Sequence, residues 1–151
     1  MSGDFLKNRI RVIYEGAPAN AFVDPEQMKQ AFLNIIMNAI DAMPEGGVMT
    51  VSSCPRPADA GLFISISDTG CGISEDKLNH IFDPFYTSKE QGTGLGLAVT
   101  HSIIQKNGGK IEVQSKVDAG TTFKICLLSG NIRCPTQLDS LNQIIYISNL
   151  T

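Results

Sequence analysis

Residues 24–43, DPEQMKQAFLNIIMNAIDAM, decide how this chain folds, because they predict one long helix with two different sides. Asp24 suits the N-cap and Pro25 the first helical position, whereas Pro44 ends the helix near Met43. At 100° per residue one side of this helix is apolar, formed by Met28, Phe32, Ile35, Ile36, Ala39 and Met43.

A narrow polar strip runs along the same helix, formed by Gln27, Asn34, Asn38 and Asp41. A solvated helix face more often carries Lys and Glu, since Asn and Asp are weaker helix formers. Two interpretations stay open, a lined polar pocket or asparagines that are buried and hydrogen-bonded. In a pocket, an Asn side-chain oxygen suits Mg²⁺, which takes few protein ligands and keeps several waters.

The composition places the chain among ordinary globular domains. It has 151 residues, 12 basic and 15 acidic side chains, a net charge of -3, and 42% hydrophobic residues. That length suits one domain, and the composition argues against disordered, collagen-like or coiled-coil chains. Mild acidity argues against binding to nucleic acid, and no apolar run approaches the ~20 residues of a membrane span. We therefore expect no nucleic-acid partner and no direct membrane insertion.

The cysteines give no sign of a disulfide or zinc framework. Cys54, Cys71, Cys126 and Cys134 form no CxxC pair, and the chain has two histidines. We expect reduced cytosolic thiols rather than a structural metal site.

The remaining elements follow from periodicity and from glycine and proline positions. Alternating apolar residues predict strands over residues 9–15, 48–53, 62–67, 110–115 and 121–128. Two further helices are expected over residues 74–81 and 95–107, and residues 54–61 and 82–94 are expected to be loops. Residues 130–151 carry no motif, so an added strand, a native extension and sequence introduced for expression stay open.

Two glycine clusters follow predicted elements. In Asp68-Thr69-Gly70-Cys71-Gly72, glycines let the backbone approach a flat ligand, and Asp68 can accept a hydrogen bond from an exocyclic amine. The alternative for this cluster is a plain turn.

The second cluster, Gly92-Thr93-Gly94-Leu95-Gly96, opens a helix whose free N–H groups suit phosphate. It matches neither the P-loop nor the dinucleotide-binding fingerprint. A flexible loop is the alternative. Lys89, three residues earlier, is either a mobile cation for phosphate or a solvated lysine.

The order of the motifs is more specific than any one of them. NIIMNAIDAM, DTGCGI, FDPFYTSK, GTGLGL and GTTFKICL follow one another along the chain. This order resembles the ATP-binding catalytic domain of sensor histidine kinases, most of all the nitrogen-regulation type, over about residues 8–128. That domain belongs to the superfamily of gyrase B, Hsp90 and MutL.

The resemblance implies an α+β fold. In this Bergerat-type two-layer α/β sandwich, about three helices cover one face of a mixed, mostly antiparallel sheet, and a long lid closes over ATP. It implies that Asn38 binds Mg²⁺, that Asp68 binds the adenine amine and that Lys89 reaches the phosphates. The other nucleotide-binding residues that it implies are Asn34, Asp41, Gly70, Gly72, Gly92, Thr93, Gly94, Leu95, Gly96 and Thr121.

One position separates this sequence from relatives that hydrolyse ATP. They carry a Glu four residues before the N-box Asn, as general base, and here that position is Asn34. An amide cannot accept a proton at neutral pH, which favours a histidine kinase. A stand-alone ATPase switch of the gyrase or Hsp90 kind, and a nucleotide sensor that transfers nothing, are the alternatives. We expect Asp41 to have a water- or metal-linked role.

The phosphoacceptor is missing from the predicted machinery. Neither His80 nor His101 precedes an acidic residue or lies in a helical hairpin, so both are interpreted as structural. We therefore expect residues 1–129 to be a catalytic module and residues 130–151 an extension. Its partners would be the dimerisation and phosphoacceptor hairpin of the same kinase and, indirectly, a response regulator. The expected location is the cytoplasm, in a kinase that can be membrane-anchored.

Overall fold

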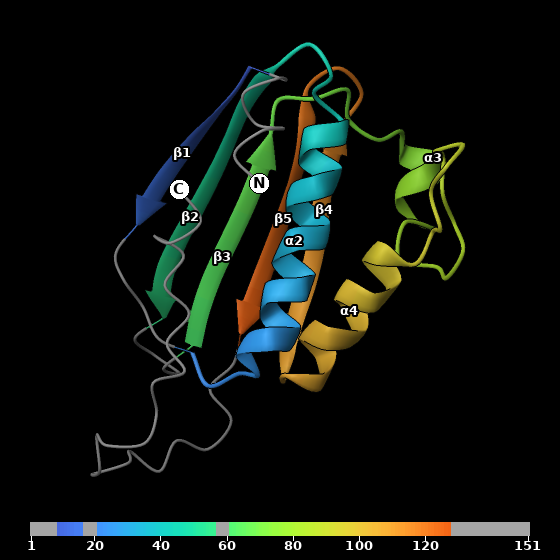
Figure 1. The fold of residues 1–151 in the computed structure, drawn as a ribbon. Helices are drawn as coiled ribbons and strands as arrows, with labels where there is room; N and C mark the ends of the chain where they lie inside the picture. Colours follow the sequence, from blue (N-terminus) through green and yellow to red (C-terminus); the bar gives the residue numbers. More distant parts are fainter. Residues whose placement is uncertain (1–8, 17–20, 57–60, 128–151) are drawn as a thin grey trace, which may run out of the picture.

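The computed structural model describes residues 9–16, 21–56 and 61–127, which form one sheet and three helices (Figure 1). The residues expected to form the extension, 130–151, and Cys134 among them lie outside this described part. Of the cysteines in the described part, Cys54 and Cys71 are free thiols.

The sheet has five strands in the order β1-β2-β3-β5-β4. β1 lies parallel to β2, and the other neighbouring pairs are antiparallel, which confirms the expected mixed, mostly antiparallel sheet. In chain order the strands are β1 (Ile10–Gly16), β2 (Gly47–Arg56), β3 (Gly61–Asp68), β4 (Gly109–Lys116) and β5 (Gly120–Leu127).

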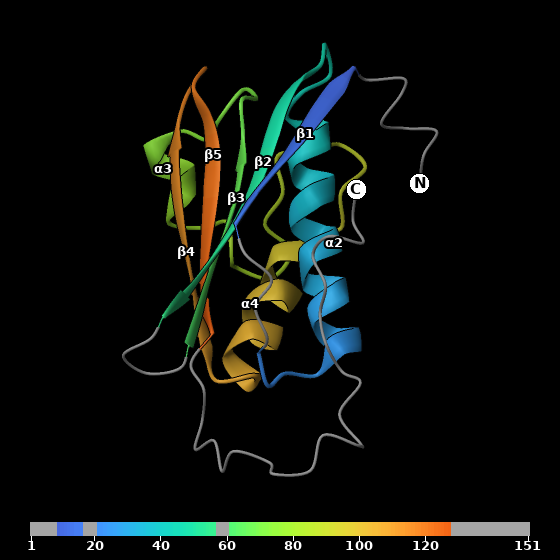
Figure 2. The same cartoon turned by 90° about the vertical axis from the view of Figure 1, so that its left-hand side faces the viewer.

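Two helices cover one face of the sheet, so the molecule has two layers (Figures 1 and 2). They are α2 (Pro25–Asp41) and α4 (Gly96–Lys106), and they pack against each other. The third expected helix is only the four-residue α3 (Glu75–Leu78), which contacts β4. No helix in the described ranges is long and apolar enough to cross a membrane.

Two element boundaries differ from expectation for physical reasons. The helix expected over residues 74–81 ends at Leu78, because the following N–H groups bond to the third residue back, His80 to Lys77 and Asp83 to His80. β2 continues through Pro55, which the sequence places in a loop. β1 ends opposite Ser53, so Pro55 lies where β2 has a free edge, and proline is tolerated there.

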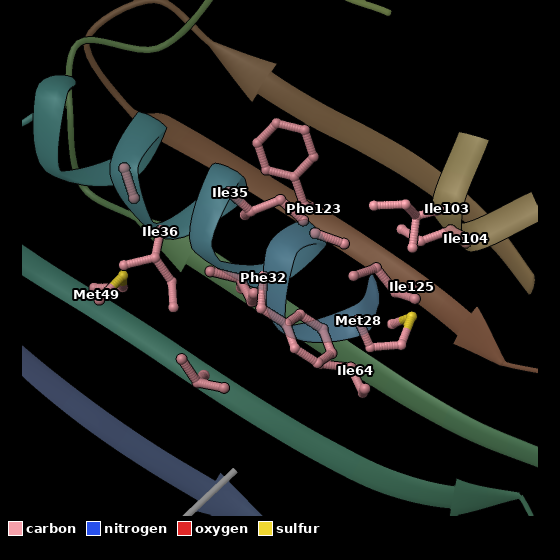
Figure 3. Close-up of a cluster of buried hydrophobic side chains, with 14 of the residues drawn as sticks. Met28, Phe32, Ile35, Ile36, Met49, Ile64, Ile103, Ile104, Phe123 and Ile125 are labelled. Carbon is pink, nitrogen blue, oxygen red and sulfur yellow. The ribbon is translucent and has the colours of Figure 1, made fainter. Parts of the chain in front are cut away.

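One hydrophobic core fills the space between the layers (Figure 3). Every residue of the predicted apolar side of α2 is buried in it. β3 and β5 contribute alternate residues, and α4 adds two more: Leu62, Ile64, Ile66, Phe123, Ile125, Leu127, Ile103 and Ile104. The core therefore fixes α2 and α4 over the middle of the sheet and leaves the polar strip of α2 at their border.

Candidate functional site

The C-terminal half of α2 carries three of the predicted polar side chains. Asn34 and Asn38 are half-buried and Asp41 is exposed. Asp24 fixes the start of this helix, because its Oδ1 accepts hydrogen bonds from two N–H groups of the first turn at 3.0 and 3.1 Å. The cap fixes where the helix starts, and the buried apolar side fixes its rotation, so together they determine where the polar strip faces.

Asn34 fastens α2 to the start of α4. Its Nδ2 donates to the carbonyl oxygen of Gly96 at 3.0 Å and to Thr100 Oγ1 at 3.2 Å. Thr100 is fully buried and donates from Oγ1 to the same carbonyl at 2.8 Å. A carboxylate in this position could make neither bond, since it has no N–H donor. The sequence reasoning missed Thr100, whose one signal was its place a turn after Gly96.

A second connection between the helices was also missed. Asn107 follows α4, and its Oδ1 accepts a hydrogen bond from the backbone N–H of Asp24 at 2.8 Å. Its Nδ2 donates to Gln27 Oε1 at 3.3 Å. Asn107 therefore holds the far end of α4 against the start of α2, and an Asn just before Gly108 was the only sign of it.

Asp68 ends β3 and is buried, with 6% of its surface exposed. Its Oδ1 accepts hydrogen bonds from the backbone N–H groups of Gly70 at 2.8 Å and Thr121 at 3.3 Å. Burial raises the pKa of Asp68 above its ordinary value, and the two hydrogen bonds only partly oppose that rise.

The second oxygen of Asp68, Oδ2, bonds to no residue of the described part. No buried side-chain oxygen in that part lacks a partner, so Oδ2 reaches solvent. A carboxyl group with one oxygen fixed and the other accessible can receive a hydrogen-bond donor from a ligand.

Gly70 and Gly72 allow close approach of backbone segments after Asp68. A Cβ on Gly70 would lie 2.5 Å from the carbonyl oxygen of Ala42, which accepts a hydrogen bond from Cys71 N–H at 3.0 Å. Gly72 has φ +70°, and its Cβ would lie 2.0 Å from the carbonyl oxygen of Lys116. This turn is therefore wedged between the end of α2 and the β4–β5 turn.

Thr121 of β5 completes the surroundings of Asp68. It is 4% exposed, and its Oγ1 lies 2.9 Å from Ser115 Oγ on β4. Ser115 Oγ also accepts a hydrogen bond from Ile73 N–H at 2.8 Å. Ser115, which the sequence did not single out, links the glycine turn to the last two strands.

The loop over residues 82–94 has its two ends tied together. Phe85 N–H donates to the carbonyl oxygen of Gly94 at 2.9 Å, and the φ angles of these residues are +66° and +69°. A Cβ on Gly94 would lie 2.4 Å from the carbonyl carbon of Phe85. The Phe85 side chain is 75% exposed, and Tyr86 lies against the ring of His80, 5.6 Å between centroids.

Both histidines contact neighbours in or beside this loop. His80 Nδ1 lies 2.8 Å from Asp83 Oδ2. The ring of His101, on α4, packs against Phe82 with centroids 5.2 Å apart.

The glycine-rich segment leads into α4. Leu95 holds the N-cap position, and no side chain caps the helix, so the N–H groups of the first turn are open to an acceptor. Two N–H groups just before it bond inside the segment, Gly92 to the carbonyl oxygen of Lys89 and Leu95 to Thr93 Oγ1, at 3.2 and 3.4 Å.

Lys89 reaches from the loop to α2. Its Nζ donates to Asn38 Oδ1 at 3.0 Å and to Asp41 Oδ2 at 2.5 Å. The side chains of Lys89 and Asp41 are each 46% exposed.

The C-terminal half of α2 is thus where the predicted segments meet. Asn34 contacts the start of α4, Asn38 and Asp41 contact the loop, and Ala42 contacts the glycine turn after Asp68. The described part holds no group of three or more His, Cys, Asp or Glu placed to bind a metal. A separate cavity of about 370 Å³ is formed by β2, β3, β4 and β5, and none of the predicted nucleotide- or metal-binding residues lines it.

Comparison with known proteins gives a consistent result. Residues 23–131 match the family described as histidine kinase-, DNA gyrase B-, and HSP90-like ATPases. Sporulation kinase E of Bacillus subtilis (strain 168) is 47% identical over 106 residues, 70% of this chain. Sensor histidine kinase ZraS of Escherichia coli (strain K12) is 44% identical over 104 residues, 69% of this chain.

The fold matches that of a solved catalytic domain as well. The catalytic domain of histidine kinase ThkA superposes with a TM-score of 0.75 at 28% identity, covering 85% of this chain and 86% of that one. The chain spans only 14% of sporulation kinase E and 22% of ZraS. Both the sequence match and the fold lead to one conclusion: the chain belongs to the family of histidine kinase-, DNA gyrase B- and HSP90-like ATPases.

Proposed function

We propose that this chain is the ATP-binding catalytic module of a two-component sensor histidine kinase in the cytoplasm. It binds Mg·ATP and donates the γ-phosphoryl group to a histidine on a separate dimerisation hairpin, for onward transfer to a response regulator. The observation that carries this proposal is the meeting of three predicted segments at the C-terminal half of α2. The names of the relatives, a sporulation kinase and a sensor histidine kinase, support it.

In this proposal Asp68 recognises the adenine ring. Its accessible Oδ2 accepts a hydrogen bond from the exocyclic amine, while Gly70 and Thr121 N–H groups hold Oδ1 and so orient the carboxyl group. Gly70 and Gly72 have no side chains and pack closely against neighbouring backbone, so a flat base can approach the backbone of this turn.

The phosphates are assigned to the start of α4. Its uncapped first turn supplies N–H groups and the positive end of the helix dipole, at the segment formed by Gly92, Thr93, Gly94, Leu95 and Gly96. This arrangement needs no basic patch, which agrees with the net charge of -3. Lys89 adds a positive charge on the loop beside it.

Mg²⁺ fits the oxygen atoms at the polar strip. Asn38 Oδ1 and Asp41 Oδ2 already converge on one cation, the Lys89 ammonium, and such oxygens are the ligands that Mg²⁺ prefers. Mg²⁺ keeps several waters, so two protein oxygens would be enough to hold it here. Asn38 and Asp41 would hold the metal at the end of α2, and a bound Mg²⁺ would supply positive charge against the triphosphate.

Asn34 argues for transfer to a histidine and against hydrolysis. Its amide cannot take a proton from water, and both of its N–H donors are engaged with α4. The residues of this chain therefore position ATP, and the acceptor side supplies any acid or base.

The proposal is tested first by ligand binding. At 100 times its Kd, a ligand stabilises the folded state by about 2.7 kcal/mol, so Mg·ADP should raise the Tm of the chain by several degrees. Asp68→Asn should lose this shift, because an amide presents a donor toward the adenine amine. Asp118→Asn, in the β4–β5 turn, is the matched control and should keep it.

The reaction is tested by incubation with labelled ATP. We expect no phosphate release from the chain alone, and labelling of a phosphoacceptor hairpin from the same kinase when it is added. Steady phosphate release without an acceptor would instead identify a stand-alone ATPase switch. Binding without labelling of the hairpin would identify a nucleotide sensor.

A further inference from the structure

Two side-chain oxygens of α2 hold the Lys89 ammonium. Asn38 and Asp41 lie one turn apart on α2, and their side-chain oxygens bracket the Lys89 ammonium at 3.0 and 2.5 Å. These residues are 51 and 48 positions from Lys89 in sequence, so the contact is made by the fold and not by a local turn. The oxygen pair holds a positive charge that belongs to the protein itself.

Two cations cannot occupy this oxygen pair together. An ammonium and a divalent ion a few ångströms apart repel strongly, and Asn38 Oδ1 is the oxygen assigned to the metal. We propose that Lys89 is a tethered cation that competes with a divalent metal for this oxygen pair, and that the metal must displace it. This inference rests on the proposed function, because the metal site is part of it.

Displacement of Lys89 is coupled to the shape of the loop. Lys89 N–H donates to Thr87 Oγ1 at 3.0 Å, and the Lys89 carbonyl oxygen accepts a hydrogen bond from Gly92 N–H at 3.2 Å. Its side chain therefore extends from a tight turn that leads directly into the glycine-rich segment. Release of the ammonium from α2 frees this turn to follow the phosphates.

The contact of Lys89 with Asn38 and Asp41 is weak enough for a divalent metal to displace the ammonium. Both Lys89 and Asp41 are 46% exposed, and an exposed ion pair contributes little to stability. We therefore expect Lys89 to lower metal affinity about twofold to fivefold rather than to block the site.

Mutual exclusion predicts that Lys89 and the metal are partly redundant. Without metal, Lys89 supplies the positive charge beside the phosphates, so its loss should weaken ADP binding. With saturating Mg²⁺ the metal would supply most of that charge, so the loss of Lys89 should weaken ADP binding less than it does in EDTA. The ADP Kd in EDTA divided by the ADP Kd in Mg²⁺ should therefore be larger in Lys89→Met than in the parent. If Lys89 served only as a phosphate ligand, its loss would weaken ADP binding equally in EDTA and in Mg²⁺.

The test uses three variants, Lys89→Met, Lys89→Arg and the control Lys77→Met on α3. ADP Kd values are measured by calorimetry in Mg²⁺ and in EDTA. Paramagnetic broadening by Mn²⁺ is measured separately on the nucleotide-free chain, at the Asn38 side-chain amide and the Asp41 backbone N–H. In Lys89→Met we expect a larger Kd ratio and stronger broadening, about twofold to fivefold. Lys89→Arg keeps the charge and should behave like the parent, as should Lys77→Met.

Two results would overturn the inference. One is an equal loss of ADP affinity with and without Mg²⁺ in Lys89→Met. The other is Mn²⁺ broadening at Asn38 and Asp41 that is absent, or that is the same in Lys89→Met and the parent. Failure of the proposed function is a different result, because then the parent chain itself would not bind ADP.

Discussion

Asp68 is the residue in which stability and binding are most clearly opposed. Its burial disfavours the charged carboxylate and raises its pKa, and the hydrogen bonds from Gly70 and Thr121 repay only part of that cost. A ligand that donates a hydrogen bond to Oδ2 would stabilise the charged form further. Perturbed carboxyl groups of this kind are common at functional sites.

The pH dependence of unfolding should reveal this opposition. The folded pKa of Asp68 lies above the ordinary value of 3.8, so its stabilising contribution is complete below pH 3.8 and is lost as pH rises through the folded pKa. Asp68→Asn removes the charge and keeps an oxygen for the two N–H groups. Its stability relative to the parent should therefore increase with pH and then level off. Urea unfolding from pH 4 to pH 8 measures this difference.

Asp118→Asn serves as the reference for this series. Asp118 is exposed in the β4–β5 turn, so the same change of charge should give no comparable gain relative to the parent as pH rises. If the difference in unfolding free energy between Asp68→Asn and the parent did not change with pH, burial would not raise the pKa of Asp68.

The roles of single residues could be predicted only in part from the sequence. Asp68 follows a strand and precedes glycines, and that local pattern marked it as a candidate, with a plain turn as the alternative. The partners of Asn34 are 62 and 66 residues away, and those of Lys89 are 51 and 48 residues away, so no local pattern specifies them. The sequence could therefore offer a pocket-lining Asn34 or a hydrogen-bonded Asn34 but could not choose, and the amide proves to be bonded to α4.

Among the elements, α2 was the most predictable because its signals are local. Asp24, Pro25 and the spacing of the buried residues specify its start and its orientation. β2 was less predictable, since the tolerance of Pro55 depends on where a neighbouring strand stops. The expected α3 was too long because the residues after Leu78 form tight turns with hydrogen bonds to the third residue back, which apolar spacing does not reveal.

The segment before α4 offers a test with matched glycines. Gly94 has φ +69°, and a Cβ there would lie 2.4 Å from the Phe85 backbone, so Gly94→Ala should distort the loop and weaken Mg·ADP binding. A Cβ on Gly96 would meet only Asn34, at 3.7 Å, an ordinary contact. Gly96→Ala should keep or raise the Tm, because Ala favours helix. Thermal unfolding and ADP titration of both variants measure these effects.

The two glycines belong to one motif but have different physical roles. Equal losses of ADP affinity in Gly94→Ala and Gly96→Ala would contradict this assignment. They would indicate that both positions must lack a side chain for the ligand rather than for the backbone.

At the scale of the whole molecule, stability is concentrated in the single core between the two layers. The polar strip, the glycine turn and the loop lie at the margin of this core, which holds them in position. Core substitutions should therefore change stability far more than they change the affinity of the folded protein for a ligand.

Two methionines of α2 test this separation. Met28 is fully buried and Met37 is 45% exposed. Met28→Ala should lower the free energy of unfolding by about 2–5 kcal/mol, because it leaves a cavity. Met37→Ala should change it by no more than about 0.5 kcal/mol. Urea unfolding gives both values, and similar losses would mean that α2 is not packed as described.

The place of β5 in the sheet has a consequence for how the protein is made. β5 is the last described strand in the chain, yet it lies between β3 and β4. On the ribosome, β1, α2, β2 and β3 emerge first, whereas β4 emerges before the one strand with which it pairs. Thr121, which completes the hydrogen bonding of Asp68, arrives with that same strand. In the proposed function, the nucleotide site is therefore complete only once β5 has joined the sheet, so nucleotide binding would distinguish chains with a complete sheet from nascent ones.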